Sequence, residues 1–197
     1  MSYTPQDLQE LIKYNQRTGE LVWRPRTEEI YERYGNPSPR RACTWFNASC
    51  AGKPLGTTTN HGVASTRISL GSGTPTLRRA MTWVAWAVAT GTVPNGQLRV
   101  GDGDQNNLRP ANVVLCSAHV ARIMTSPSTG IFSYELADGG GLRWGYNISQ
   151  DQGAVQREVR GFMTLTSARE ARDKHLKDMG LWFVQTLAQR LRELRHA

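Results

Sequence analysis

Three observations predict a mixed α+β protein of two small modules, residues 1–125 and 126–197. A length of 197 residues allows one or two domains. Residues 97–108 read as a strand followed by a loop rich in Gly, Asp and Asn. A glycine-rich turn at residues 138–141 separates two strand-like segments, and a helical segment from residue 167 comes after a third.

The first module is expected to begin with a helix over residues 5–14, with Thr4 as its cap and Pro5 at its first position. A turn then leads into a strand that ends at Trp23. Residues 27–45 contain Gly35, Pro37 and Pro39, so we expect an irregular, flexible loop. The remaining elements are expected in this order: an exposed strand over 64–70, a helix over 77–90 that stops at Gly91, a strand over 97–100, and a short helix from Pro110.

The second module is expected to hold three strands, over residues 131–136, 142–149 and 159–165. A helix over 167–179 follows, which Thr166 or Ser167 caps and Gly180 ends. A last helix over 181–195 completes the chain. The fold class is therefore α+β, with a small three-stranded sheet plus helix and a C-terminal helix in the second module.

Charge is unevenly spread along the chain. Lys and Arg number 24 against 16 Asp and Glu, and no acidic residue lies between Glu32 and Asp102. The net charge of +8 equals the number of basic residues in that segment. They are Arg33, Arg40, Arg41, Lys53, Arg67, Arg78, Arg79 and Arg99. A basic surface that serves only solubility is the plain alternative. Arginine suits phosphate and guanine edges, so we expect a polyanion as partner, most simply nucleic acid.

Several classes of protein are disfavoured. No segment approaches the roughly 20 apolar residues of a membrane helix, so we expect no membrane partner. The N-terminal residues lack a basic-then-apolar signal, so we do not expect secretion. Cys43, Cys50 and Cys116 form no CxxC pair, which argues against a disulfide scaffold or a zinc ribbon and fits a reducing cytoplasm.

Four segments in sequence order resemble the HNH homing endonucleases of phages. They are Leu11–Arg26, Phe46–Gly56, Thr82–Pro94 and Leu98–Val114 (LRVGDGDQNNLRPANVV). The resemblance covers roughly residues 8–122 and implies a ββα-metal module. Residues 129–179 resemble the three-strand-plus-helix DNA-binding domain of plant ethylene-response factors, through Gly130-Ile131, Arg143-Trp144, Tyr146-Asn147-Ile148, Gly161-Phe162 and Ala168–Ala171. A generic hairpin plus helix is the alternative for that module.

The resemblance also implies which catalytic groups are missing. An HNH site uses a carboxylate that holds a divalent metal and a His that takes a proton from water. The Asp-His pair of the family falls on Arg99 and Val100, and the His of its earlier helix falls on Thr82. Asn112 keeps the family's Asn, and Gly103, Asn107 and Arg109 keep the shape of the loop. A guanidinium would repel a dication. We therefore expect a degenerate site without nuclease activity or a cofactor.

Two alternatives stay open. Asp102, Asp104 and Asn107 could hold a hard cation through oxygen ligands, although such loops are usually turns. A relocated site at Asp102, Asp104 and Asn112 would make the chain an active, Mg-dependent endonuclease. The other alternative is a protein-interaction factor that binds a host or phage enzyme acting on nucleic acid. His61 is too isolated to be nominated as a base.

The resemblance implies a phage-type protein that grips double-stranded DNA in the cytoplasm of an infected bacterium; the oligomeric state stays open. Residues expected to contact DNA in the first module are Lys53, Arg67, Arg78, Arg79, Arg99 and Arg109. In the second module, Arg143, Trp144 and Arg160 are expected to reach the major groove. For Trp144, a place in the core is the alternative.

Overall fold

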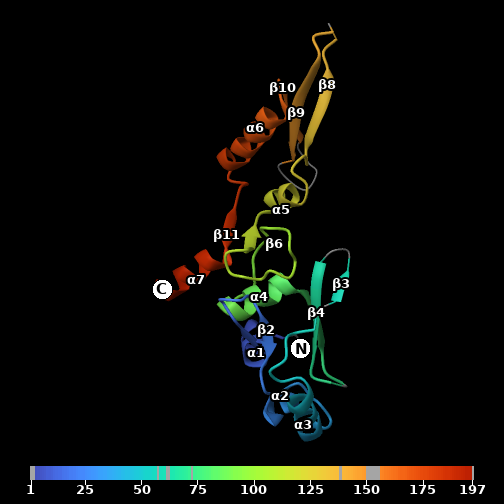
Figure 1. Cartoon of the computed structure of the whole chain (residues 1–197), viewed down its shortest axis with the longest axis vertical. Coiled ribbons are helices and arrows are strands. Elements are labelled where there is room, and N and C mark those ends of the chain that lie inside the picture. Colours follow the sequence, from blue (N-terminus) through green and yellow to red (C-terminus); the bar gives the residue numbers. More distant parts are fainter. Residues whose placement is uncertain are drawn as a thin grey trace. The chain divides into compact units, whose positions relative to one another are not determined.

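The computed structural model describes residues 3–56, 58–60, 63–71, 73–137, 139–149 and 156–196 (Figure 1). These residues form two compact units. Unit 1 is residues 1–115 with 185–197, and unit 2 is residues 116–184. Helices and small sheets occur in both, which confirms the mixed α+β class. No helix in the described part of the chain has the length and apolar character needed to cross a membrane.

Unit 1 is built from short elements around one core. In chain order these are α1 (Pro5–Leu11), β1 (Ile12–Tyr14), β2 (Leu21–Trp23), α2 (Glu28–Arg33), α3 (Pro39–Ser49), β3 (Thr58–Asn60), β4 (Val63–Ser69), β5 (Thr76–Ala80), α4 (Met81–Thr90), β6 (Gln97–Val100), β7 (Val113–Cys116), β11 (Val184–Thr186) and α7 (Leu187–His196). Its sheets have the strand orders β1-β2, β3-β4-β5 and β11-β7-β6. The last residue of β7, Cys116, and the first residue of β11, Val184, are counted in unit 2.

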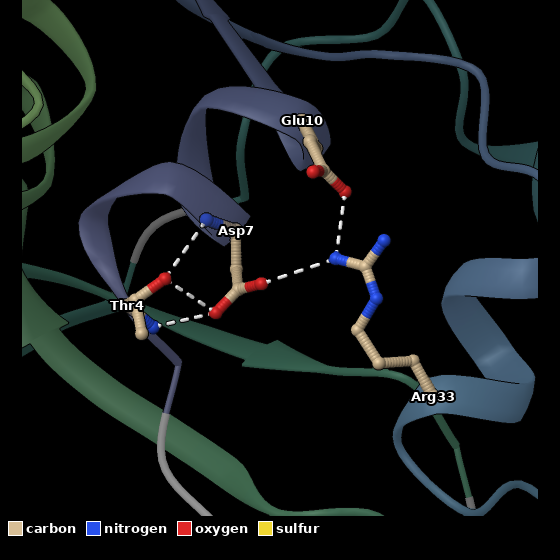
Figure 2. Close-up of polar contacts among 4 residues, drawn as sticks. All are labelled: Thr4, Asp7, Glu10 and Arg33. Carbon is tan, nitrogen blue, oxygen red and sulfur yellow. Dashed lines mark hydrogen bonds and ion pairs between the residues drawn. The ribbon is translucent and has the colours of Figure 1, made fainter.

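Helix α1 begins as the sequence predicts. The Thr4 hydroxyl accepts a hydrogen bond from the Asp7 N–H, and the Asp7 carboxylate accepts one from the Thr4 N–H, at 3.2 and 2.7 Å. This reciprocal cap satisfies two otherwise unpaired N–H groups. From α2, Arg33 forms ion pairs with Asp7 and Glu10 and so ties the two helices together (Figure 2). The helix ends at Leu11 instead of residue 14, because Ile12–Tyr14 pair with β2.

The prediction of a flexible loop over residues 27–45 was wrong, because α2 and most of α3 lie there. Pro39, read as a chain breaker, occupies the first turn of α3, where proline is favoured. Both helices enclose Arg26, which is 4% exposed. Its guanidinium lies 3.4 Å from the ring centre of Phe46 and donates to the Tyr31 hydroxyl. Burial lowers the pKa of Arg26, while the neighbouring Tyr31 opposes that shift.

The β3-β4-β5 sheet of unit 1 also differs from expectation. The strand predicted over 64–70 is found as β4, residues 63–69, but it is the middle strand of its sheet, and Ala64, Ile68 and the following Leu70 are buried. Residues 76–80 form β5 instead of the start of a helix, because they pair in register with β4. Helix α4 therefore begins at Met81, and it ends at Gly91 (φ +68°) as predicted.

The loop region and the C-terminus correct the predicted domain boundary. Strand β6 and the loop after it are confirmed, but no helix begins near Pro110; residues 113–116 form β7. The chain passes into unit 2 at residue 116, not 126. Residues 181–195 are not one helix, since β11 interrupts them, and α7 returns to unit 1. Leu187 and Leu191 are buried in the core of unit 1, which holds α7 there.

Unit 2 contains the predicted three-stranded sheet and helix. Its elements are α5 (Ala118–Thr125), β8 (Ile131–Glu135), β9 (Leu142–Ser149), β10 (Gln156–Phe162) and α6 (Leu165–Asp178). The sheet has the order β10-β9-β8 with antiparallel pairs. Tyr146 and Ile148 bury one face against Leu176 of α6. The cap of α6 is Thr164, two residues earlier than predicted, with Ser167 as its reciprocal partner. Asp138, in the predicted hairpin turn, lies outside the described residues.

Candidate nucleic-acid interface

Two arginines face each other across β4 and β5. Arg67 and Arg78 are directly paired in the sheet register, and both are exposed. Thr66 and Ile68, on either side of Arg67, point into the core, so the Arg67 side chain projects from the opposite face. Like charges directly opposite each other destabilise a sheet. Neither arginine forms an ion pair with any described residue, so the repulsion between them is left uncompensated.

Arg79 and Lys53 lie elsewhere on the surface of unit 1. The Arg79 guanidinium sits 5.4 Å from the centre of the Trp83 ring, a cation–π distance, and its side chain remains exposed. Lys53 is exposed in the turn after α3, where its backbone carbonyl accepts a hydrogen bond from the Trp23 N–H. Among described residues, Arg33 is the one member of the basic 33–101 segment with an ion pair.

The loop between β6 and β7 closes on itself. The Asp102 carboxylate accepts hydrogen bonds from the Asn107 amide (2.6 Å), the Asn112 amide (2.9 Å) and the Asp104 N–H (2.9 Å). The Asn112 amide also donates to the Asn107 carbonyl at 2.6 Å, and its oxygen accepts from the Asp102 N–H. The structure therefore brings Asp102, Asn107 and Asn112 together, on a loop and not on a helix.

These hydrogen bonds set the chemistry of Asp102. The bond from Asn107 and then those from the Asp104 N–H and Asn112 lower the pKa of the Asp102 carboxyl. Asp104 points elsewhere in the loop, where its carboxylate accepts from the Asn106 N–H at 2.9 Å. No cluster of three or more His, Cys, Asp or Glu side chains placed to hold a metal ion occurs within the described ranges.

The other positions that the family resemblance singled out lie on α4 and β6. Thr82 is 6% exposed and Val100 is 7% exposed, so both side chains face the interior. Arg99 is half-buried, and its guanidinium donates to the Leu98 carbonyl at 3.0 Å. These positions offer neither a carboxylate nor an imidazole. His61, which the sequence did not favour as a base, lies outside the described residues.

Arg109 is exposed at the end of the same loop. Its backbone is held firmly, since the Arg109 carbonyl accepts from the Asn112 N–H at 2.8 Å. Gly19 lies against it: a Cβ atom built on Gly19 would come within 2.6 Å of the Arg109 nitrogen. With φ at +83°, this position needs glycine on both counts. The β1–β2 turn thus supports the loop that carries Arg109.

In unit 2 the three predicted DNA-contact residues divide between the two faces of the sheet. Tyr146 of β9 is buried on the face that packs against α6. Arg143 lies three residues before Tyr146, and Arg160 is paired with Gly145, next to Tyr146, so both arginines lie on the opposite face. Trp144 lies on the same face as Tyr146, so the structure does not group it with the two arginines. Sequence reasoning missed Phe132 and Tyr134, whose rings lie 5.7 and 5.1 Å from the Arg160 guanidinium. Phe132 and Tyr134 are two residues apart in a predicted strand, and this spacing, which puts both rings on one face, was the available signal.

Comparison of the chain with protein-family models, with curated proteins and with solved structures finds no match. The assignment of function therefore depends on the geometry above.

Proposed function

We propose that the chain is a phage-type, double-stranded DNA-binding protein derived from an HNH homing endonuclease and lacking nuclease activity. The observation that carries the proposal is the exposed Arg67–Arg78 pair, two like charges in direct register without an acidic partner among described residues. Two phosphates of a nucleic-acid backbone would supply the missing counter-charge. Its place of action in this proposal is the cytoplasm of an infected bacterium.

The state of the former catalytic positions supports the absence of cleavage. Asp102 already accepts three hydrogen bonds within its loop, so a metal would have to displace Asn107 or Asn112. The buried Val100 cannot take a proton from water, as the histidine base of an HNH site does. Arg99 would place a cation where that site holds a metal, and it would instead donate to a phosphate.

The second module supports DNA binding in this proposal through Arg143 and Arg160. Arg160 is paired with Glu158, so its charge is partly neutralised before any DNA arrives. We therefore assign most of the electrostatic attraction to unit 1. The face that carries Arg143, Arg160 and two aromatic rings contributes contacts to bases.

A gel-shift with random duplex, run with and without Mg²⁺, tests binding, and incubation with supercoiled plasmid tests cleavage. We expect a shift that does not need Mg²⁺, and plasmid that stays intact over hours. Nicking that disappears in the Asp102→Asn variant would instead support a relocated nuclease site. Duplex binding that is weak and fully suppressed by salt would favour a protein-interaction factor.

A further inference from the structure

Helix α3 presents an exposed indole, that of Trp45, one turn beyond two arginines in its first turn. Trp45 is 64% exposed, whereas the other tryptophans among the described residues are buried or half-buried. It borders a hollow of about 610 Å³, which falls within the roughly 300–1,000 Å³ typical of small-molecule sites. The residues that line it are Ser38, Pro39, Arg40, Arg41, Thr44 and Trp45.

These side chains do not serve the packing of α3. The helix is held to unit 1 by its other face, where Cys43 and Phe46 are buried and Asn47 donates to the Arg26 carbonyl at 2.8 Å. Arg41 and Trp45 are four residues apart and so lie on one face of the helix. The exposed Trp45 indole therefore offers a flat aromatic surface on which a base could stack.

The charge of the hollow indicates an anion. Arg40 and Arg41 stand in the first turn of α3, where the helix dipole disfavours cations, and that turn contains no acidic residue. Neither arginine forms an ion pair with a described residue. The lining therefore combines two uncompensated guanidinium groups with a flat aromatic surface and includes no carboxylate.

The hollow also lies close to the strand that carries Arg67. Asn36, just before α3, donates to the Leu70 carbonyl at 2.6 Å and accepts from the Ser38 N–H at 2.8 Å. Leu70 is three residues beyond Arg67, about 10 Å at the usual rise of a strand.

We propose that this hollow binds an unpaired nucleotide of single-stranded DNA, with its base stacked on Trp45 and its phosphate held by Arg40 and Arg41. Stacking on an aromatic side chain tolerates any base, and guanidinium groups suit the phosphate. A paired base inside a duplex cannot reach the indole face. Neither Arg67 nor Arg78 lines the hollow, so substitutions at Trp45 test this site without removing the proposed duplex contacts.

The test measures the affinity of the full-length chain for fluorescently labelled oligothymidylate and for a closed hairpin duplex, by anisotropy. Trp45→Ala should weaken binding of oligothymidylate roughly tenfold, the loss expected for one stacked base. Its affinity for the hairpin should stay within about twofold of wild type. Trp45→Phe should recover part of the loss, and Arg40→Gln/Arg41→Gln should reduce the salt dependence of oligothymidylate binding.

Phe183→Ala is the matched control, because Phe183 is also an exposed aromatic side chain (46%) but belongs to unit 2. It should leave both affinities unchanged. Unchanged oligothymidylate affinity in Trp45→Ala, or equal losses on oligothymidylate and hairpin, would overturn the proposal. The proposal would also be overturned if Trp45→Ala converted a dimer to a monomer in sedimentation equilibrium without losing affinity for oligothymidylate. That result would assign the hollow to self-association. Failure of hairpin binding alone would count against the proposed duplex function and not against this site.

Discussion

The two units differ in their balance of charge. Unit 1 holds 16 basic and nine acidic residues, whereas unit 2 holds eight and seven. In unit 2 the buried Arg172 donates to the carbonyls of Pro127 and Thr129, and Arg169 donates to the Ser128 hydroxyl. In unit 1, Arg67 and Arg78 have no such partner among described residues. Arg172 of unit 2 thus stabilises the fold, as Arg26 does in unit 1, whereas Arg67 and Arg78 are available to a ligand.

The units also have separate cores, and a matched pair of substitutions tests whether each core stabilises only its own unit. Leu187 of α7 is fully buried in unit 1, and Leu176 of α6 is 2% exposed in unit 2. Replacing either by Ala should lower the free energy of unfolding of its own unit by about 3 kcal/mol, through lost burial and the cavity left behind.

Hydrogen–deuterium exchange of peptides from each unit measures this effect. We expect Leu187→Ala to speed exchange in residues 1–115 and Leu176→Ala to speed it in residues 116–184. Faster exchange in unit 2 after Leu187→Ala would mean that α7 does not belong to unit 1, or that the two cores unfold together.

A smaller effect is expected at the helix caps, one in each unit. Thr4 caps α1 and Thr164 caps α6, each in a reciprocal arrangement with the residue three positions on. Thr4→Ala and Thr164→Ala should each cost about 1 kcal/mol in their own unit, while Ser substitutions, which keep the hydroxyl, should cost much less. Denaturant melts of the four variants provide the measurement. Equal stability of Ala and Ser variants would contradict the capping role.

The smallest effect is expected in the loop of Asp102. Its pKa is lowered in the folded chain, so its contribution to stability is present above the unfolded value near 3.8 and is lost as pH falls through the depressed value. Asn107→Ala removes the first of the responsible hydrogen bonds and should move the pKa of Asp102 upward. Titration of the carboxyl carbon by NMR measures this shift; an unchanged pKa would show that Asn107 does not set it.

Local sequence signals predicted some elements well. Thr4 with Pro5 indicated the start of α1, Gly91 indicated the end of α4, and the glycine-rich turn indicated the β8–β9 hairpin. In each case the deciding interaction lies within a few residues along the chain, where sequence patterns are informative.

Elements decided by distant contacts were missed. Residues 76–80 have an apolar spacing compatible with a helix, but their pairing with β4 makes them a strand. The helices of residues 27–45 depend on packing around Arg26, which no local pattern indicates. In the candidate site, the basic segment was visible in the sequence, whereas the direct register of Arg67 with Arg78 required the structure.

The salt dependence of duplex affinity tests the central claim most directly. It should be measured for wild type, for Arg67→Ser/Arg78→Ser, and for the unit 2 pair Arg143→Ser/Arg160→Ser as control. If Arg67 and Arg78 each contact one phosphate, the slope of log affinity against log salt should fall in magnitude by about 2 in the first variant. The control should change less, because Arg160 is already paired with Glu158. An unchanged slope in Arg67→Ser/Arg78→Ser, or a larger loss in the control, would contradict the account.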